Sequence, residues 1–140
     1  MSEKIQTTDA PSTVSSGPTH EEMATAISYF QSGSFAEAET FLIDLIQKYP
    51  NDPFAWKGVS VVLYQQGKLF EALKPMQELV RISPEDGEAH SNLGSLLNEL
   101  GRKEESEACL RRAVELLPRF AEGHFNLGNL LKELGRLHEA

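Results

Sequence analysis

A period of 34 residues runs through most of this 140-residue chain and constrains its fold more than any other feature. Its clearest markers are glycines and prolines that recur at this step: Gly33, Gly67, Gly101 and Gly135, and Pro50, Pro84 and Pro118. A fixed period of this length is typical of stacked helix–turn–helix units, none of which can bury its apolar face alone. Such a stack presents a groove rather than an enclosed catalytic pocket, so the sequence predicts a binding protein.

Each period contains two apolar stretches with helical spacing, as in Leu93, Leu96, Leu97 and Leu100 of the third. A glycine follows the first stretch, at a position where the left-handed conformation ends a helix. A proline follows the second stretch and stops that helix from continuing. We therefore expect two antiparallel helices of roughly 12–14 residues in each period, joined by a tight turn. The expected repeats are residues 19–52, 53–86, 87–120 and, in part, 121–140.

Small residues occupy two further columns of the period. The column in the first helix reads Ala26, Ser60, Gly94 and Gly128. The column in the second helix reads Ala38, Ala72, Ser106 and Ala140. Small side chains allow two helices to approach closely, so we expect axes near the lower end of the ~8–10 Å range.

Composition argues against several classes of function. The formal net charge of −8 argues against nucleic acid, whose binding needs clustered Lys and Arg. No run reaches the ~18 apolar residues of a membrane span. Residues 1–18 lack the build of a signal peptide and instead indicate a disordered polar tail. The single cysteine, Cys109, is expected to be structural and fits a reducing compartment, so we expect a cytoplasmic protein without membrane contact.

Acidic residues are concentrated in the first repeat, where residues 19–52 hold six acids and one base. Two interpretations of this excess stay open. It is either a solvated rim or a field that steers a basic partner toward this end of the array.

The columns of the period resemble those of the tetratricopeptide repeat. In the second period the family's order is matched by Trp56, Tyr64, Gly67, Ala72 and Pro84. Residues 90–94 (HSNLG) and 124–128 (HFNLG) resemble the start of the repeat's first helix. The resemblance covers residues 19–140, and the arrays it suggests are bacterial ones and that of O-linked N-acetylglucosamine transferase. It implies an all-α, right-handed α-solenoid of about 3.5 stacked helix–turn–helix repeats, with the first helix of each pair on the concave side.

Reactive side chains form no recognisable catalytic or metal-binding set in this sequence. His90 and His124 share the column of Trp56 one period apart, so stacking places them too far from each other to bind one ion. We expect both to pack in place of tryptophan. No serine lies in a nucleophile motif, and no glycine-rich phosphate loop is present. The sequence therefore predicts no enzymatic activity within these residues, and no cofactor or metal.

The concave face implied by the resemblance predicts a groove for an extended peptide. This face is apolar and aromatic in the first two repeats. In the last two it is rich in asparagine, whose amide both donates to and accepts from a peptide backbone. The expected groove residues are Met23, Ile27, Phe54, Lys57, Val61, Tyr64, Ser91, Asn92, Ser95, Asn98, Phe125, Asn126, Asn129 and Lys132. We therefore expect a protein–protein interaction scaffold with a protein or peptide partner.

Two grooves known in the family can be compared with this one. Readers of chaperone tails hold a terminal carboxylate with a clamp of Lys, Asn and Arg. Lys57 and Asn92 match that clamp, but Val61 replaces an asparagine and Glu122 replaces a lysine, which argues against it. The transferase array has a ladder of asparagines at the column that here reads Ala24, Gly58, Asn92 and Asn126, so two rungs match.

Two other functions stay open from the sequence. Because the fourth repeat stops early, the array is also read as the N-terminal, substrate-recruiting region of a larger enzyme, a glycosyltransferase or sulfotransferase. An uncapped last helix would also leave Leu127, Leu131 and Leu134 partly exposed. That exposure favours self-association through this helix.

Overall fold

Helices alone build the part of the chain that the structure, a computed structural model, describes, which is residues 17–135. The helices are α2 (His20–Gln31), α3 (Phe35–Lys48), α4 (Pro53–Gln65), α5 (Leu69–Ile82), α6 (Gly87–Glu99), α7 (Lys103–Leu116) and α8 (Ala121–Glu133). Their lengths are 12 to 14 residues. The predicted all-α helical repeat is therefore confirmed.

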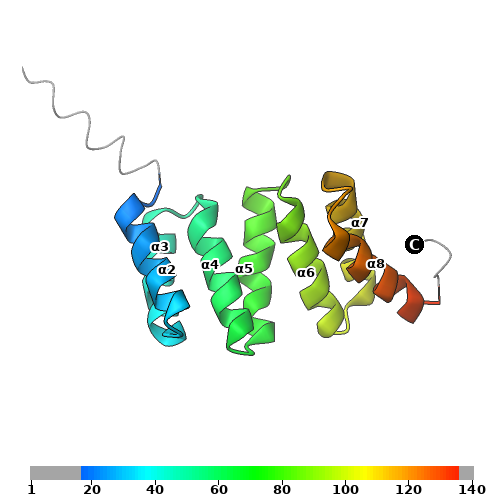
Figure 1. Cartoon of the computed structure of the whole chain (residues 1–140), viewed down its shortest axis with the longest axis horizontal. Coiled ribbons are helices and arrows are strands. Elements are labelled where there is room, and N and C mark those ends of the chain that lie inside the picture. The colour runs from blue at the N-terminus through cyan, green and yellow to red at the C-terminus, as the bar shows by residue number, and fades with distance from the viewer. Residues whose placement is uncertain (1–16, 136–140) are drawn as a thin grey trace, which may run out of the picture.

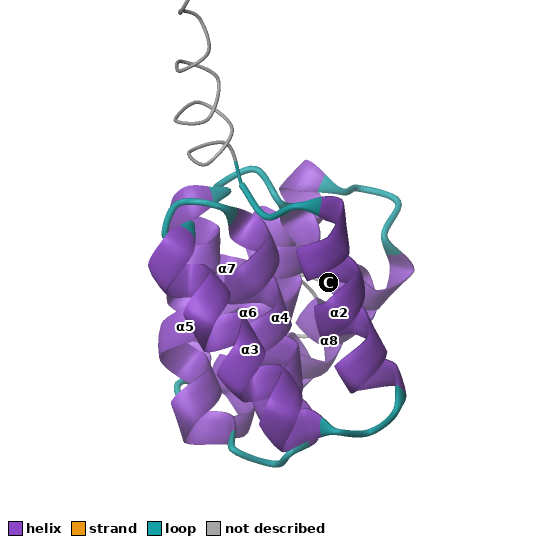
Figure 2. Ribbon diagram, turned by 90° about the vertical axis from the view of Figure 1, so that its left-hand side faces the viewer, coloured by secondary structure: helices purple, strands orange, loops and turns teal. Residues whose placement is uncertain are grey.

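The helices stack side by side along one long axis (Figure 1). Each packs against the next helix in the chain, and α2 also contacts α4 while α6 contacts α8. Seen end-on, α2 and α8 lie toward one side of the stack and α5 and α7 toward the other, with α4 and α6 between them (Figure 2). The first helices α2, α4, α6 and α8 are called the wall of first helices below, because their side chains share the lining of two adjoining hollows. Within this wall α4 and α6 make few direct contacts.

A glycine in the left-handed conformation follows the first helix of every repeat. The φ angles of Gly33, Gly67, Gly101 and Gly135 are 78°, 76°, 83° and 76°. At the first of these turns, the Ser34 N–H donates to the Tyr29 carbonyl, which satisfies a carbonyl at the helix end. A Cβ added at any of the four glycines would meet no other atom within 4 Å. The backbone angle, and not crowding, therefore requires glycine at this column.

Side chains fix where three of the first helices begin. The Thr19 hydroxyl accepts from the Glu22 N–H, and the Glu22 carboxylate accepts from the Thr19 N–H, so α2 starts with a capping box. Asp52 caps α4, whose first residue is Pro53. Asp86 caps α6 by accepting from the Ala89 N–H. These caps satisfy N–H groups that the first turn of a helix leaves without partners.

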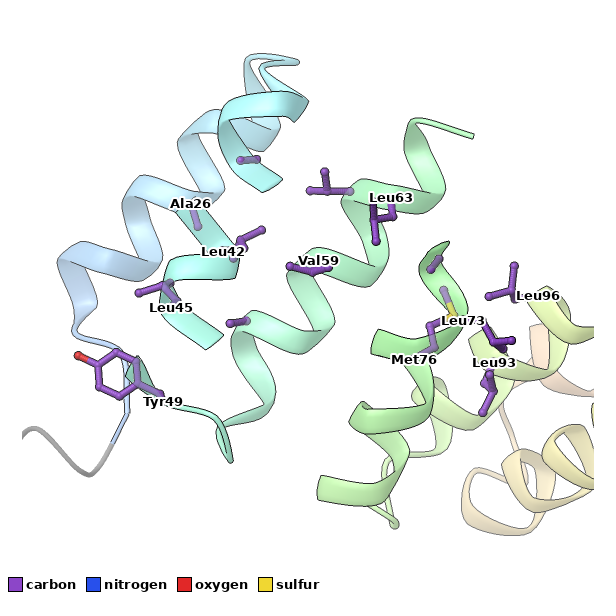
Figure 3. Close-up of a cluster of buried hydrophobic side chains, with 14 of the residues drawn as sticks. Ala26, Leu42, Leu45, Tyr49, Val59, Leu63, Leu73, Met76, Leu93 and Leu96 are labelled. Atoms are coloured by element: carbon purple, nitrogen blue, oxygen red, sulfur yellow. The ribbon is translucent and has the colours of Figure 1, made fainter. Parts of the chain in front are cut away.

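The larger of the two hydrophobic clusters in the described residues extends from α2 to α6 (Figure 3). Leu45 and Val62 are 2% and 1% exposed, and Leu96 is fully buried. The apolar residues that the helical spacing singles out therefore face one another across the repeats, as a solenoid core requires.

A second, smaller cluster joins Leu110 of α7 to Leu127, Leu130 and Leu131 of α8. We had expected Leu127 and Leu131 to be partly exposed, and this was wrong: they are 6% and 0% exposed. They are buried because they pack with Leu110 and with the half-buried Val114. The exposed apolar patch expected here is thus absent at these two leucines, and self-association through α8 stays an untested prediction.

Small residues bring α6 and α7 into direct contact, as the two columns predict. The Ser106 hydroxyl, fully buried, donates to the Gly94 carbonyl at 2.6 Å. A Cβ at Gly94 would lie 2.7 Å from two atoms of the Leu110 side chain, so only glycine fits this approach. Ala140, expected in the same column as Ser106, lies outside the described residues.

The ends of the chain are described only in part. Residues 1–16, which hold most of the polar tail expected from the sequence, lie outside the described part of the chain, and so do residues 136–140. Among the helices described, none combines the length and the apolar character needed to cross a membrane.

Candidate binding groove

An apolar hollow of about 200 Å³ lies between α2 and α4. Its lining residues are Ala26, Ile27, Phe30, Leu42, Phe54, Lys57, Gly58, Val61 and Val62. The only charged side chain in this lining is Lys57, whose Nζ lies 3.9 Å from the Asp86 carboxylate. Ile27 is 46% exposed, so the hollow keeps an apolar rim in contact with solvent.

A larger hollow of about 870 Å³ continues from α4 across α6 to α8. Its lining residues are Val61, Tyr64, Met76, Asn92, Ser95, Asn98, Glu99, Leu110, Glu122, Asn126, Asn129, Lys132 and Glu133. Most of these belong to first helices, whereas Met76 of α5 and Leu110 of α7 are buried residues of second helices. Val61 lines both hollows, which therefore adjoin one another along the wall of first helices.

Hydrogen bonds hold several polar side chains of the larger hollow in place. The Asn126 amide donates to the Ser95 hydroxyl at 3.0 Å, which ties α8 to α6. Lys103 donates to the Asn98 side-chain carbonyl at 2.7 Å and to the Glu133 carboxylate at 2.9 Å. The Lys103 ammonium thereby lowers the pKa of Glu133 below its ordinary 4.5.

Tyr64 and Glu99 connect α4 to α6 across the same hollow. The Tyr64 hydroxyl donates to the two carboxylate oxygens of Glu99, each at 3.1 Å. Burial of the ring, together with these hydrogen bonds, raises the pKa of the Tyr64 hydroxyl above its ordinary 10.0. The phenol therefore stays a neutral donor at physiological pH.

Four residues that line the larger hollow keep free polar groups. Within residues 17–135 the side chains of Asn92, Glu122, Asn129 and Lys132 make no hydrogen bond or ion pair. Asn92 and Asn129 are exposed, so both amides are available to a ligand.

The structure brings most of the groove residues predicted from the sequence to these two hollows. The exceptions are Met23, Ser91 and Phe125, which line neither. Ser91 was expected on the exposed face, and that was wrong: it is 1% exposed, and its Oγ has no hydrogen-bond partner among the described residues. Phe125 is 67% exposed but lies outside both hollows.

Three carboxylates that line the larger hollow, Glu99, Glu122 and Glu133, were not among the expected groove residues, although Glu122 was compared with the lysine of the carboxylate clamp. Helical spacing could have found them. Glu99 lies seven residues after Asn92, and Glu122 lies four residues before Asn126, so each shares a helix face with a predicted groove residue. Met76 and Leu110 were not expected there either, because the expected groove was built from first helices alone and these two residues belong to second helices.

The residues of the tryptophan column share one contact. The ring nitrogens of Trp56, His90 and His124 lie 2.8, 2.9 and 2.7 Å from the carbonyls of Pro50, Pro84 and Pro118. The histidines therefore take the place of tryptophan, as expected.

In the described part of the chain no group of three or more His, Cys, Asp or Glu residues is arranged to hold a metal ion. Cys109 packs against the larger cluster, and burial raises the pKa of its thiol.

Comparison with known families assigns the repeat. Residues 23–87 match a family described as "Tetratricopeptide repeat", and residues 94–135 match one described as "TPR repeat". The chain belongs to the tetratricopeptide repeat family. No curated protein matches its sequence.

Solved tetratricopeptide repeat structures share this fold. One is a double mutant of MamA from RS-1, at a TM-score of 0.78 and 21% identity over 84% of this chain and 66% of that one. A second is MamA from residue 41 to the end, from Desulfovibrio magneticus RS-1. Its TM-score is 0.76 and its sequence identity 21%, over 84% of this chain and 67% of that one. A third is the first TPR of Spaghetti (RPAP3), bound to the HSP90 peptide SRMEEVD. Its TM-score is 0.77 and its sequence identity 20%, over 81% of this chain and 90% of that one. The chain thus spans about two thirds of the MamA structures.

Membership of this family indicates a function in general terms. Tetratricopeptide repeats are protein-interaction modules and are typically not catalytic, so this chain is a protein-interaction scaffold in general terms.

Proposed function

We propose that the wall of first helices binds an extended peptide segment of a partner protein. The observation that carries this proposal is the pair of adjoining hollows that share Val61 and together run from α2 to α8. A peptide in extended conformation fits such a course because it exposes side chains and backbone polar groups along its whole length. The RPAP3 structure, similar in fold, holds a peptide, which supports this mode of binding.

The two hollows suit different parts of such a peptide. The apolar one accepts a bulky aliphatic or aromatic side chain against Ile27, Phe30 and Phe54, which transfers apolar surface out of water. In the larger one the unoccupied amides of Asn92 and Asn129 each offer a donor and an acceptor to the peptide backbone. The peptide is thus anchored at one end and kept extended at the other.

The test replaces the two unoccupied amides. Peptides are first selected with the whole chain from a random decapeptide display library, and their affinities are measured by fluorescence polarisation. Asn92→Ala with Asn129→Ala should weaken binding about 5- to 100-fold, because each net hydrogen bond is worth about 0.5–1.5 kcal/mol.

The matched control replaces two exposed amides elsewhere, Asn51→Ala with Gln77→Ala, in the loop before α4 and on the second helix α5. It should bind like the unmodified chain. Failure to select any peptide, or equal affinities for the two double variants, would contradict the proposal.

A further inference from the structure

Charge distinguishes the larger hollow from a site for an acidic tail. Four of its lining residues are acidic or basic: Glu99, Glu122, Lys132 and Glu133. Three carboxylates thus face one ammonium. The peptide SRMEEVD in the RPAP3 structure carries three acidic residues and one arginine, the opposite balance.

Two of these carboxylates have no cationic partner among the described residues. Glu122 makes no hydrogen bond or ion pair within residues 17–135. Within the same residues, Glu99 accepts only from the Tyr64 hydroxyl, which is a neutral donor. Glu133 differs, because its carboxylate is paired with the Lys103 ammonium at 2.9 Å. A cation entering the hollow therefore meets Glu99 and Glu122 as acceptors without having to displace a protein cation from either.

The apolar hollow lacks this negative charge. Its one cation, Lys57, is opposed by the Asp86 carboxylate at 3.9 Å. The two parts of the groove therefore select for different side chains: an apolar one between α2 and α4, and a basic one between α6 and α8.

Resting on the peptide-binding function above, we propose that the groove selects a basic peptide with an apolar anchor. Packed helices lie on the order of 10 Å apart, and an extended chain advances ~3.3 Å per residue. Because the two parts of the groove are two repeats apart, the apolar and basic residues are expected about six positions apart in the ligand.

Arginine suits the basic position better than lysine. Its planar guanidinium can donate two parallel hydrogen bonds to one carboxylate, as Glu99 and Glu122 each allow. The ring of Tyr64, 38% exposed beside Glu99, also offers a face on which a guanidinium can stack.

The experiment compares selections from the same random decapeptide library with three proteins. The first is the unmodified chain. The second carries Glu99→Gln, Glu122→Gln and Glu133→Gln, which removes the charge of the hollow while keeping the size of its side chains. The third carries Glu37→Gln, Glu71→Gln and Glu104→Gln, an equal change of net charge at exposed positions in the first turns of α3, α5 and α7. Thermal unfolding verifies that all three are folded.

The unmodified chain and the control should enrich peptides that contain arginine or lysine about six positions from an apolar residue. The groove variant should lose the basic preference, retain the apolar one, and bind an enriched peptide about tenfold more weakly. Enrichment of acidic peptides, or peptides without charge preference, would overturn this inference and leave peptide binding itself standing. If no protein enriches any peptide, the proposed function fails and this inference fails with it.

Discussion

At the scale of single residues, the Glu22 side chain makes three hydrogen bonds that connect two helices. Its carboxylate accepts from the backbone N–H of Thr19, from the Lys48 ammonium and from the Tyr49 hydroxyl. It thereby joins the start of α2 to the end of α3. Tryptophan or histidine fills the same column in the other repeats, so the first repeat replaces a ring contact with an ionic one.

Glu22 should make the stability of the chain depend on pH below neutrality. The hydrogen bond from Lys48, followed by that from the Thr19 N–H, lowers the pKa of Glu22 from 4.5 to about 2. A carboxyl whose pKa is lower in the folded state stabilises fully above about pH 4.5, and this contribution disappears as the pH falls toward 2. We expect Glu22→Gln to lower the thermal midpoint at pH 7 and to have little effect near pH 2. Glu21→Gln, in the same helical turn, is the control; equal pH profiles for the two variants would contradict this account.

Gly94 should tolerate no side chain, even a small one. A Cβ there would lie 2.7 Å from Leu110, which is 1% exposed and has little room to move. Gly94→Ala should therefore destabilise the chain by about 1–3 kcal/mol in urea unfolding, although alanine is the better helix former. Gly123→Ala, whose nearest neighbour would be Phe120 at 3.3 Å, should be close to neutral. A neutral Gly94→Ala variant would show that α6 and α7 can separate at little cost.

At the scale of the helix, a ring at the tryptophan column anchors each later first helix to the loop before it. The ring nitrogen meets a proline carbonyl six residues earlier in the second, third and fourth repeats. The proline ends the preceding helix, and its backbone carbonyl accepts a hydrogen bond from the ring of the following helix. The turn between repeats is thus held by a side chain as well as by backbone geometry.

Replacing His90 tests this anchor. His90→Phe keeps an aromatic ring but removes the donor to the Pro84 carbonyl, so we expect a loss of about 0.5–1.5 kcal/mol. His90→Trp should retain stability, because Trp56 makes the same hydrogen bond to Pro50. Urea unfolding of both variants provides the comparison. Equal stabilities would show that the ring packs there without a contributing hydrogen bond.

Helices and turns were the part of this chain that the sequence could predict. The glycine column requires positive φ and the proline column stops helices, so both mark boundaries through local backbone physics. Whether an individual side chain is buried or exposed was harder to predict. Ser91 lies beside the exposed Asn92 in sequence but is buried. Glu99 and Glu122 were not among the expected groove residues, although helical spacing places each on the same helix face as Asn92 or Asn126.

At the scale of the whole molecule, the core is divided. The larger cluster joins α2 to α6, whereas the smaller one depends mainly on four leucines of α7 and α8. In a repeat protein each unit is stabilised by itself and by its neighbours, so the free energy of opening can differ along the stack. The acidic end of the groove is built partly on the smaller cluster, because Glu122 and Glu133 belong to α8.

This division predicts unequal hydrogen exchange along the 140-residue chain. The backbone amides of α8 should exchange through openings that cost less free energy than the openings that expose the amides of α4 and α5. The reason is that α4 and α5 lie in the middle of the larger cluster, between α3 and α6. Leu130→Ala, which removes a fully buried side chain from the smaller cluster, should cost about 2–5 kcal/mol and reduce protection mostly in α7 and α8. Leu45→Ala in the larger cluster should instead reduce protection mostly from α2 to α5. If both variants lowered protection uniformly, the stack would open as one unit, and the acidic end of the groove would be as rigid as the apolar end.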